Sequence, residues 1–357
     1  MYKFLITLLL LVFNLHSYAS EADAPFFLRD SFAKAVPGDY VVIEQNRINT
    51  LFHVYGKTAT TLILEEVSLP VDVRKQQISS WKEWMRGGAE GNISWLMYEL
   101  DLSRNKETIQ CVECYSFSRQ GWLDILSADA ILPTLLKLPF TPVPEKKRRK
   151  IGKASSEGMD FRPKWQPPLT VDGNVVRQAT FDAWETHWAE DNTELAGKKI
   201  EIYLPSASLI QSEGQNFPTY FPVWLQVTGG LGAAHLRIID SGKSLTSPKP
   251  LFPRHPLEFL DSGRIINGNL QLRLKGSAAY KEFALYASEI PDDESAPPIS
   301  LTCTATFDSA RVITLEVTAD VLEKALKPGH KYIFWGTPFG YDETLAKTKQ
   351  PLTIPQR

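Results

Sequence analysis

Short runs in which apolar and polar residues alternate dominate the chain, and this pattern predicts β-strands. The clearest run lies in residues 217–240, where Val223, Leu225 and Val227 alternate with more polar neighbours. A glycine-rich loop at residues 229–232 follows, and a second apolar run comes after it. Because glycine tolerates the positive φ that a reversal needs, this stretch predicts a β-hairpin.

The first part of the chain predicts an antiparallel sheet with one or two helices packed on it. Apolar residues at positions 78, 81 and 85 recur at helical spacing, so we expect one amphipathic helix over residues 72–85. A second helix is expected over residues 128–138, after a cap at Ser127. The expected strands are residues 39–44, 50–55, 60–67, 93–100 and 108–117.

The second part predicts a β-sandwich-like domain made of short, closely spaced strands. It is expected to open with a short helix at residues 181–188 and to contain another helix at residues 321–327, which Pro328 and Gly329 end. The expected strands are residues 199–204, 223–228, 235–239, 269–274, 282–287, 300–307, 312–318 and 331–335. The fold class is therefore mainly β (α+β), with an N-terminal antiparallel sheet or half-barrel and a C-terminal sandwich-like domain.

The domain layout follows from a change in composition near the middle of the chain. Residues 141–168 contain five prolines and the basic run Lys146–Lys150, which predicts an exposed linker. We therefore expect an N-terminal domain at residues 25–140 and a C-terminal domain at residues 169–337. Residues 338–357 are polar and predict a loose tail.

The N-terminus has the pattern of a secretory signal peptide. Lys3 precedes an apolar run from Phe4 to Phe13, and Ser17-Tyr18-Ala19 forms a small-x-small cleavage site. We expect cleavage after Ala19, which predicts an exported protein of the periplasm or the extracellular space. The run is too short to span a membrane, since a spanning helix needs about 20 apolar residues.

The composition is that of a globular protein and favours no charged partner. The chain is 43 % hydrophobic and 22 % charged, and its formal net charge is −2. A net charge so close to zero gives no overall attraction to nucleic acid, so we expect no nucleic-acid partner. An envelope protein, a lipid or a glycan is the kind of partner that an exported chain would meet.

The three cysteines, Cys111, Cys114 and Cys303, are too few for a disulfide-based scaffold. Residues 108–117 read as a strand, in which positions three apart lie about 10 Å apart. A bond between Cys111 and Cys114 therefore requires a turn or a bulge there. Buried thiols, or one bond to Cys303, are the alternatives, and zinc is disfavoured because no second ligand pair is present.

Several motifs imitate cofactor sites but lack the context that the chemistry needs. Gly242-Lys243-Ser244 has no earlier glycine and no following helix, so it predicts a turn and not a phosphate loop. Gly230-Leu231-Gly232 lies between two strands, which excludes a dinucleotide site at a helix N-terminus. His187, near Glu190, is expected on a solvated helix face. We therefore expect no catalytic, cofactor or metal residues.

A basic run and an aromatic set of residues are candidates for binding surfaces. The basic run Lys146–Lys150 is interpreted as a solvated spacer, although an anionic lipid or polysaccharide surface would also attract it. Trp165 and the aromatic segment Phe217–Pro222 would suit sugars or peptides if exposed, but we expect them to pack against a domain. Trp81, Trp84, Trp184 and Trp188 are expected to anchor the core.

The expected function is binding or assembly in the bacterial envelope, without catalysis. The alternative is a carrier of a lipid or a small apolar ligand inside the N-terminal half-barrel. The residues expected to line that interior are Leu51, Val54, Leu62, Leu64, Leu96 and Tyr98. A hydrolase with dispersed residues is the third possibility, and a cleft with paired carboxylates or a histidine–acid pair would favour it.

Overall fold

The structure is a computed structural model that describes residues 25–103, 110–123, 131–153, 162–190, 194–213, 217–229, 232–290, 297–307, 311–341 and 344–356. The described residues are mostly in antiparallel β-strands, which confirms the predicted fold class. The chain divides into two compact units. Unit 1 holds the residues up to Ala35, Ile43–Gln45 and Leu135–Gly242. Unit 2 holds Val36–Val42, Asn46–Thr134 and the residues from Lys243 onward.

Unit 1 is built on a sheet with the strand order β1-β8-β11-β12-β13-β14-β2. Its hairpin at residues 224–242 confirms the predicted one, with Gly229 opposite Gly232. Leu28, Phe32 and Phe140 are fully buried in this unit. The strands are β1 (Phe26–Phe27), β8 (Pro139–Pro142), β11 (Phe181–His187), β12 (Lys199–Pro205), β13 (Trp224–Gly229), β14 (Gly232–Gly242) and β2 (Tyr40–Gln45), of which β2 continues into unit 2.

Smaller elements complete unit 1. A two-stranded sheet pairs β9 (Leu169–Val171) with β10 (Asn174–Val176). The helices are α2 (Leu28–Phe32), α5 (Ile131–Lys137), which crosses the boundary between the units, α6 (Ala207–Glu213) and the 3-10 helix η2 (Glu145–Lys147).

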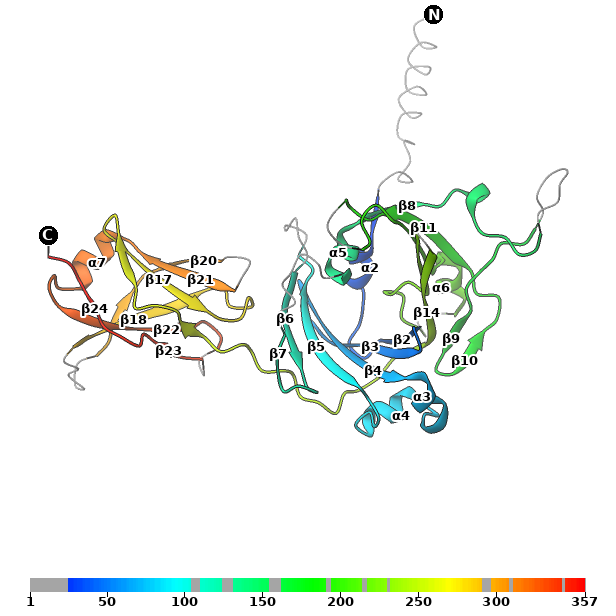
Figure 1. The fold of residues 1–357 in the computed structure, drawn as a ribbon, viewed down its shortest axis with the longest axis horizontal. Helices are drawn as coiled ribbons and strands as arrows, with labels where there is room; N and C mark the ends of the chain where they lie inside the picture. Colours follow the sequence, from blue (N-terminus) through cyan, green and yellow to red (C-terminus); the bar gives the residue numbers. More distant parts are fainter. Residues whose placement is uncertain are drawn as a thin grey trace, which may run out of the picture. The chain divides into compact units, whose positions relative to one another are not determined.

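Unit 2 contains the sheet β2-β3-β4-β5-β6-β7, in which sequential strands are neighbours (Figure 1). Its strands agree with the predicted antiparallel arrangement: β3 (Ile48–Lys57), β4 (Thr61–Pro70), β5 (Ser94–Asp101), β6 (Gln110–Ser116) and β7 (Gly121–Trp122). The predicted helix over residues 72–85 is two helices, α3 (Val71–Gln77) and α4 (Trp81–Arg86). Ile78 is extended, and Ser80 caps the second helix by accepting the amide N–H of Glu83.

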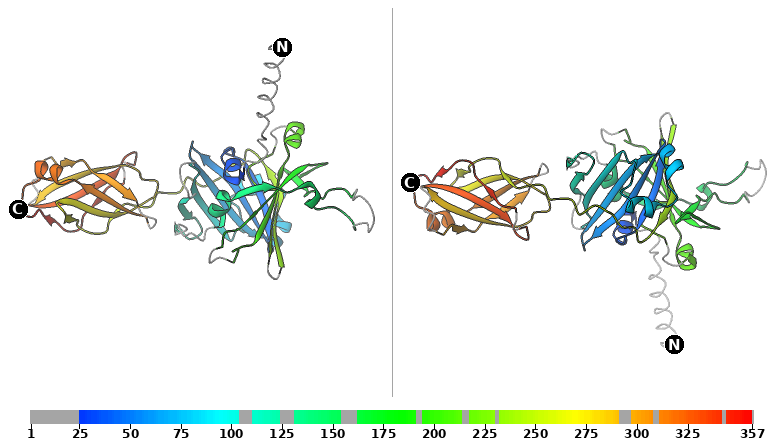
Figure 2. Two further views of the ribbon diagram at one scale, coloured as in Figure 1. Left: turned by 90° about the horizontal axis from the view of Figure 1, so that it is seen from above. Right: turned by 90° about the horizontal axis from the view of Figure 1, so that it is seen from below.

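The rest of unit 2 is a two-layered sandwich, coloured yellow to red in Figures 1 and 2. One sheet has the order β15-β17-β21-β20, and β16 also pairs with β17. The other has the order β19-β18-β22-β23, and β24 also pairs with β22. The elements are β15 (Glu258–Phe259), β16 (Arg264–Ile266), β17 (Asn269–Lys275), β18 (Phe283–Ile290), β19 (Ile299–Leu301), β20 (Thr304–Phe307), β21 (Val312–Val317), α7 (Ala319–Ala325), β22 (Lys331–Pro338), β23 (Ala346–Lys347) and β24 (Leu352–Thr353).

The sandwich core follows directly from the alternation of side chains. Leu270, Leu272 and Leu274 in β17 are completely buried, while the residues between them are partly or fully exposed. They join Tyr332 and Phe334 of the other sheet in one buried cluster. Successive side chains in a strand point to opposite faces, so each sheet covers its neighbour with one apolar face.

Residues 181–188 correct the prediction, because Phe181–His187 is strand β11 and not a helix. Phe181 and Ala183 are buried at a spacing of two residues, and the strand pairs with β12 over its whole length. The aromatic spacing that suggested a helix is also compatible with a strand whose two faces are both partly covered. Pairing with neighbouring strands overrides the local preference.

The domain boundaries also differ from the prediction. Residues 141–168 do not separate two domains, since β8 ends at Pro142 and pairs with β11 inside unit 1. The predicted loose tail is wrong as well, because β23 and β24 both pair with β22. Thr348 and Ile354 are buried there. These short strands contain prolines and polar residues and show no strand pattern of their own. Their pairing depends on strands that are distant in sequence.

The predicted signal peptide lies outside the described residues and stays a prediction. The same holds for the predicted helix cap Ser127. Within the part of the chain that is described, no helix has the length and the hydropathy that crossing a membrane would require.

Candidate functional site

Three glutamates gather on one face of the unit 2 sheet. Glu99 of β5 lies opposite Glu113 of β6, and Ile63 of β4 is on the other side of Glu99. Because residues two apart share a face, Glu65 of β4 lies on the same side as Ile63. Glu65 and Glu113 are fully buried, and Glu99 is nearly so. We call this side of the sheet the carboxylate face.

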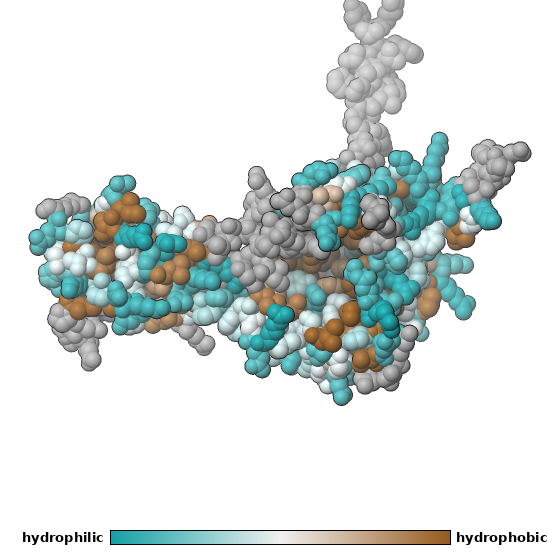
Figure 3. Space-filling view, viewed as in Figure 1, coloured by the Kyte–Doolittle hydropathy of each residue, from teal (hydrophilic) through white to brown (hydrophobic). Residues whose placement is uncertain are grey.

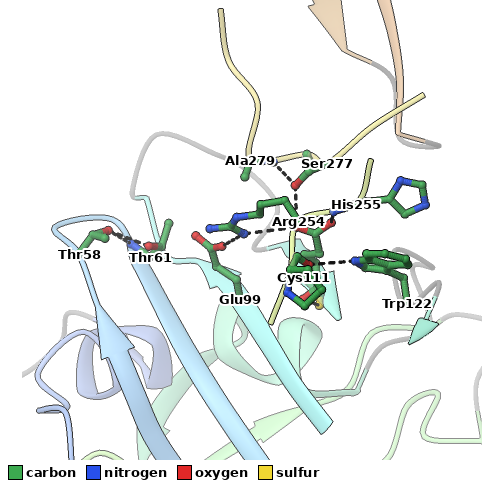
Figure 4. A network of polar contacts seen from close by, with 12 residues as sticks. Thr58, Thr61, Glu99, Cys111, Trp122, Arg254, His255, Ser277 and Ala279 are labelled. Atoms are coloured by element: carbon green, nitrogen blue, oxygen red, sulfur yellow. Dashed lines mark hydrogen bonds and ion pairs between the residues drawn. The ribbon is translucent and has the colours of Figure 1, made fainter. Parts of the chain in front are cut away.

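The segment of residues 247–255, here called the strap, supplies partners for these carboxylates. Glu113 Oε1 accepts the backbone N–H of His255 at 2.7 Å, and its Oε2 accepts the Oγ–H of Ser277 at 2.7 Å. Arg254 Nη1 donates to Glu113 Oε2 at 3.3 Å and also to Glu99 Oε2. Arg311 Nη1 lies 3.9 Å from Glu113 Oε1. Figure 4 shows Arg254 and Glu99 pointing toward each other in this network.

The charges in this cluster compensate one another. Like charges directly opposite on paired strands are destabilising, and Arg254 between Glu99 and Glu113 removes that repulsion. Burial disfavours the charged guanidinium, but the carboxylates of Glu99 and Glu113 outweigh burial and raise the pKa of Arg254. The cluster is thus a set of acidic and basic side chains that hold one another.

Two aromatic side chains, Trp122 and Tyr280, hold the strap next to Arg254. Trp122 Nε1 donates to the carbonyl of Pro253 at 3.1 Å, and the Trp122 and His255 rings lie 5.2 Å apart. Tyr280 Oη donates to the carbonyl of His255 at 2.9 Å. The strap backbone is therefore bonded through donors and acceptors that come from several elements of unit 2.

A second buried cluster contains a serine, a histidine and a glutamate. His53 Nδ1 lies 2.8 Å from Glu65 Oε2, while Ser247 Oγ donates to Glu65 Oε1 at 2.6 Å. Trp95 Nε1 donates to the same Oε1 at 2.8 Å. In a catalytic triad the histidine lies between the serine and the acid. Here the glutamate is in the middle, and among the described residues no hydrogen bond joins His53 to Ser247, so the order differs from that of a triad.

The opposite side of the sheet carries most of the residues predicted to line a half-barrel. Val54, Leu64 and Tyr98 are paired across β3, β4 and β5, and Leu62 and Leu96 share their face by alternation. We call this side the apolar face. Leu51 pairs with Val67 and lies on the carboxylate face instead. Five of the six predicted residues therefore share one face.

Glu66 is the polar exception on the apolar face. It lies between Phe52 of β3 and Leu96 of β5. All three side chains keep some accessible surface, whereas Val54, Leu62 and Leu64 are completely or almost completely buried. Among the described residues no group forms a hydrogen bond or an ion pair with the Glu66 carboxyl. Burial raises the pKa of Glu66 to about 7.

The structure also describes the cysteines, Gly242 and His187, which the sequence analysis considered as sites. Cys111, Cys114 and Cys303 are free thiols. Gly242 ends β14 and no helix follows it, as the turn interpretation requires. His187 is exposed at the end of β11, which is a strand and not the expected helix. In the described ranges no group of three His, Cys, Asp or Glu side chains is arranged to hold a metal ion.

The aromatic segments are packed, as expected. Phe217 and Tyr220 are buried, and Trp165 packs edge-on against Tyr203 and Trp224. Arg149 of the basic run lies over the Trp165 ring at 5.4 Å, and Arg148 is 3.6 Å from Asp182. At least these two charges of the run are therefore engaged with the protein itself.

The comparisons with known proteins give one family match. The profile of a family described as "CT021 protein" matches residues 50–177, which include Glu65, Glu99 and Glu113 but not the strap. Among solved structures, the chain is similar to the hypothetical protein CT021 from Chlamydia trachomatis, with 18 % identity and a TM-score of 0.45. That similarity covers 64 % of this chain and 98 % of the other. No curated protein sequence matches the chain.

Sequence reasoning missed Glu66, Glu99, Glu113 and Arg254. Glu99 and Glu113 stand inside runs that are otherwise apolar, and Glu66 follows Glu65 in a strand-like run. A charge at such a position signals a buried partner or a functional group. Arg254 lies between prolines in a segment without any periodicity, so no local signal connects it to β6.

Proposed function

We propose that the protein is an exported component of the bacterial envelope that acts by binding or assembly and not by catalysis. The observation that carries this proposal is the way Glu113 is held. Its two oxygens accept three hydrogen bonds from described residues, and Arg254 and Arg311 place two positive charges beside the carboxylates of Glu99 and Glu113. A general acid or a nucleophile has to reach its substrate. Glu113 is completely buried under its donors, so it serves to hold the strap.

The sandwich offers the surface best suited to a partner protein. Phe307 and Phe339 are 46 % and 60 % exposed. The Phe307 ring lies 6.4 Å from that of Phe283, and Phe339 donates its backbone N–H to the carbonyl of Glu282. Both exposed rings thus belong to the end of the sandwich at residues 282–283. Figure 3 shows hydrophobic patches on the surface of the sandwich. Exposed aromatic clusters are typical of protein interfaces.

The experiment that tests this proposal is photo-crosslinking in living bacteria that produce the full chain. A photoreactive phenylalanine analogue replaces Phe307, and the matched control carries it at Ile266, which is 44 % exposed. Phe307 pairs with Ile313 of β21, and Ile313 pairs with Leu274 near the end of β17. Ile266 pairs with Asn269 at the start of β17, so the control position lies at the opposite end of that strand. We expect one discrete protein adduct from position 307 and none from 266. Absence of adducts at both positions, or turnover of an ester, amide or glycoside that Glu113→Gln abolishes, would overturn the proposal.

A second candidate function, transport of a small apolar ligand, is favoured by Glu66 and its neighbours. Phe52, Glu66 and Leu96 keep some accessible surface on an otherwise buried apolar face, so a ligand could reach them. A ligand with an apolar body and one hydrogen-bond donor would satisfy the Glu66 carboxyl. Organic extraction of the purified protein, followed by mass spectrometry, tests it. A molecule recovered from the wild type and lost from Leu96→Trp supports the carrier, and an empty wild type removes it.

A further inference from the structure

Cys111 and Cys114 are brought to the same side of β6 by an irregularity in the strand. Cys114 pairs with Tyr98 and Cys111 pairs with Leu100, and the register shifts between Glu99 and Leu100. β6 therefore holds one residue more than β5 across this interval, which is a β-bulge. Tyr98 and Leu100 are two residues apart and share a face, so the two cysteines opposite them share that face too.

The bulge also shortens the separation of the two cysteines. In a regular strand, residues three apart would be separated by about 10 Å. The cysteines instead match a two-residue step of β5, which spans about 6.6 Å, and a bulge bends its strand further. Disulfide bonds join Cα atoms that are about 4.4 to 6.8 Å apart. From the sequence, a bond between these cysteines requires a turn or a bulge at this place, and the structure contains a bulge there.

The buried surroundings of the two cysteines favour an uncharged disulfide over a thiolate. Cys111 is 5 % exposed and Cys114 is fully buried, with Leu62 and Leu64 two strands away on the same face. Burial raises the pKa of Cys111 to about 12 and that of Cys114 further still. Neither thiol is therefore an effective nucleophile once the chain is folded. A disulfide is uncharged and apolar, so burial does not penalise it.

We propose that Cys111 and Cys114 form a structural disulfide bond across the bulge when the chain folds in the presence of a disulfide oxidant. The thiolate of one cysteine attacks the oxidant's S–S bond and releases one thiol. The second cysteine then displaces the other half of the oxidant from the mixed disulfide. The oxidant is reduced to two thiols, which take up the two protons, and the protein gains one S–S bond. This proposal is independent of what the protein binds.

The position of the tryptic sites allows a direct test. Trypsin cleaves after Lys106 and Arg119, so one peptide contains both Cys111 and Cys114, and Cys303 falls in the separate peptide 282–311. The full chain is refolded in a buffer of oxidised and reduced glutathione, quenched in acid, unfolded and alkylated. We expect peptide 107–119 to be two hydrogens lighter and unalkylated, with Cys303 alkylated. Two alkylated cysteines in peptide 107–119, or a bond from either of them to Cys303, would overturn the proposal.

A second measurement separates the effect of the fold from mere proximity in sequence. The same thiol–disulfide equilibrium is measured for the Cys303→Ser chain in native buffer and in urea. If the bulge places the cysteines for bonding, the ratio of disulfide to dithiol at one glutathione poise is at least tenfold higher in native buffer. A ratio that is equal in the two solvents, or higher in urea, contradicts the assignment. Wild-type side chains at 111 and 114 are used, so a folding defect of a cysteine variant does not enter.

Discussion

Glu99 and Glu113 lie directly opposite each other on β5 and β6, and both form ion pairs with Arg254. Glu113 is completely buried and accepts the amide N–H of His255 and the hydroxyl of Ser277, which lies 164 residues away in sequence. The carboxylates of β5 and β6 thus depend on donors from much later in the chain. The first stability prediction below follows from this dependence.

Removal of the arginine should destabilise unit 2 strongly. Arg254→Ala leaves two opposed carboxylates for which Arg311, 3.9 Å from Glu113, is the one remaining cation among the described residues. Breaking a buried ion pair by removing one partner costs about 3 to 5 kcal/mol of the free energy of unfolding. Urea unfolding followed by tryptophan fluorescence measures this loss. A decrease of less than about 1 kcal/mol would show that the cluster contributes no more than a surface ion pair.

The matched control for that experiment is Arg237→Ala. Arg237 Nη2 lies 2.8 Å from Glu44 Oε1, a geometry as good as that of the buried cluster. The Arg237 side chain is 47 % exposed, so water replaces its partner at small cost. We expect a loss of about 0 to 1 kcal/mol. The difference between the two variants isolates the effect of burial.

Glu66 should make stability fall as the pH rises. Its pKa is about 7 in the folded protein and lies near 4.5 ordinarily, so the folded state binds the proton more tightly. The neutral carboxyl therefore contributes its full stabilisation below pH 4.5, and this contribution is lost as the pH rises through about 7. Glu66→Gln should flatten the pH dependence of the midpoint of urea unfolding between these values. Parallel curves for the wild type and the variant would contradict this account.

Ser247 should contribute a partly buried hydrogen bond to the Glu65 carboxyl. Ser247→Ala removes one of the two donors to Glu65 Oε1 and leaves Trp95 Nε1 as the other. A hydrogen bond to a charged group contributes about 1.5 to 3 kcal/mol, and the shared acceptor places the expected loss at the lower end. Thermal unfolding measures it. A stability unchanged from that of the wild type would mean that the strap is not attached at Ser247.

The C-terminal residues should stabilise the sandwich. A chain that ends at Leu345 lacks β23 and β24 and exposes the β22 edge beside Tyr332 and Phe334, which are both fully buried. We expect its thermal midpoint to fall by several degrees, because about 1 kcal/mol corresponds to roughly 4 to 8 °C in a small domain. Removal of residues 355–357 alone is the control and should have no effect. Equal thermal midpoints for both truncated chains would support the original prediction that the C-terminal residues are loosely held.

The strands were the predictable part of the fold, and the reason is alternation. Residues 269–274 were expected as a strand from Leu270, Leu272 and Leu274, and β17 covers residues 269–275. The expected helix at residues 181–188 failed because tryptophan spacing alone cannot distinguish a helix from a strand that is covered on both faces. Its partner β8 comes from a proline-containing stretch that shows no strand pattern.

The candidate site was less predictable, because its contacts are distant in sequence. Glu99 and Glu113 could be singled out as charges within apolar runs, but their partner Arg254 follows 141 residues after Glu113. The bulge at Cys111–Cys114 likewise depends on the register against β5, which sequence alone does not determine. Burial of the aromatic segment at Phe217 was expected correctly, since large apolar side chains are seldom left exposed.

Hydrogen exchange at the amide of His255 is the most direct test of the central claim that the buried carboxylates hold the strap. That N–H donates to Glu113 Oε1 at 2.7 Å. We predict strong protection in the wild type and in Glu44→Ala, the matched exposed ion-pair variant, and loss of protection at the amides of Arg254 and His255 in Glu113→Ala. Unchanged protection of His255 in Glu113→Ala would contradict the account, because the strap would then be held without the carboxylate.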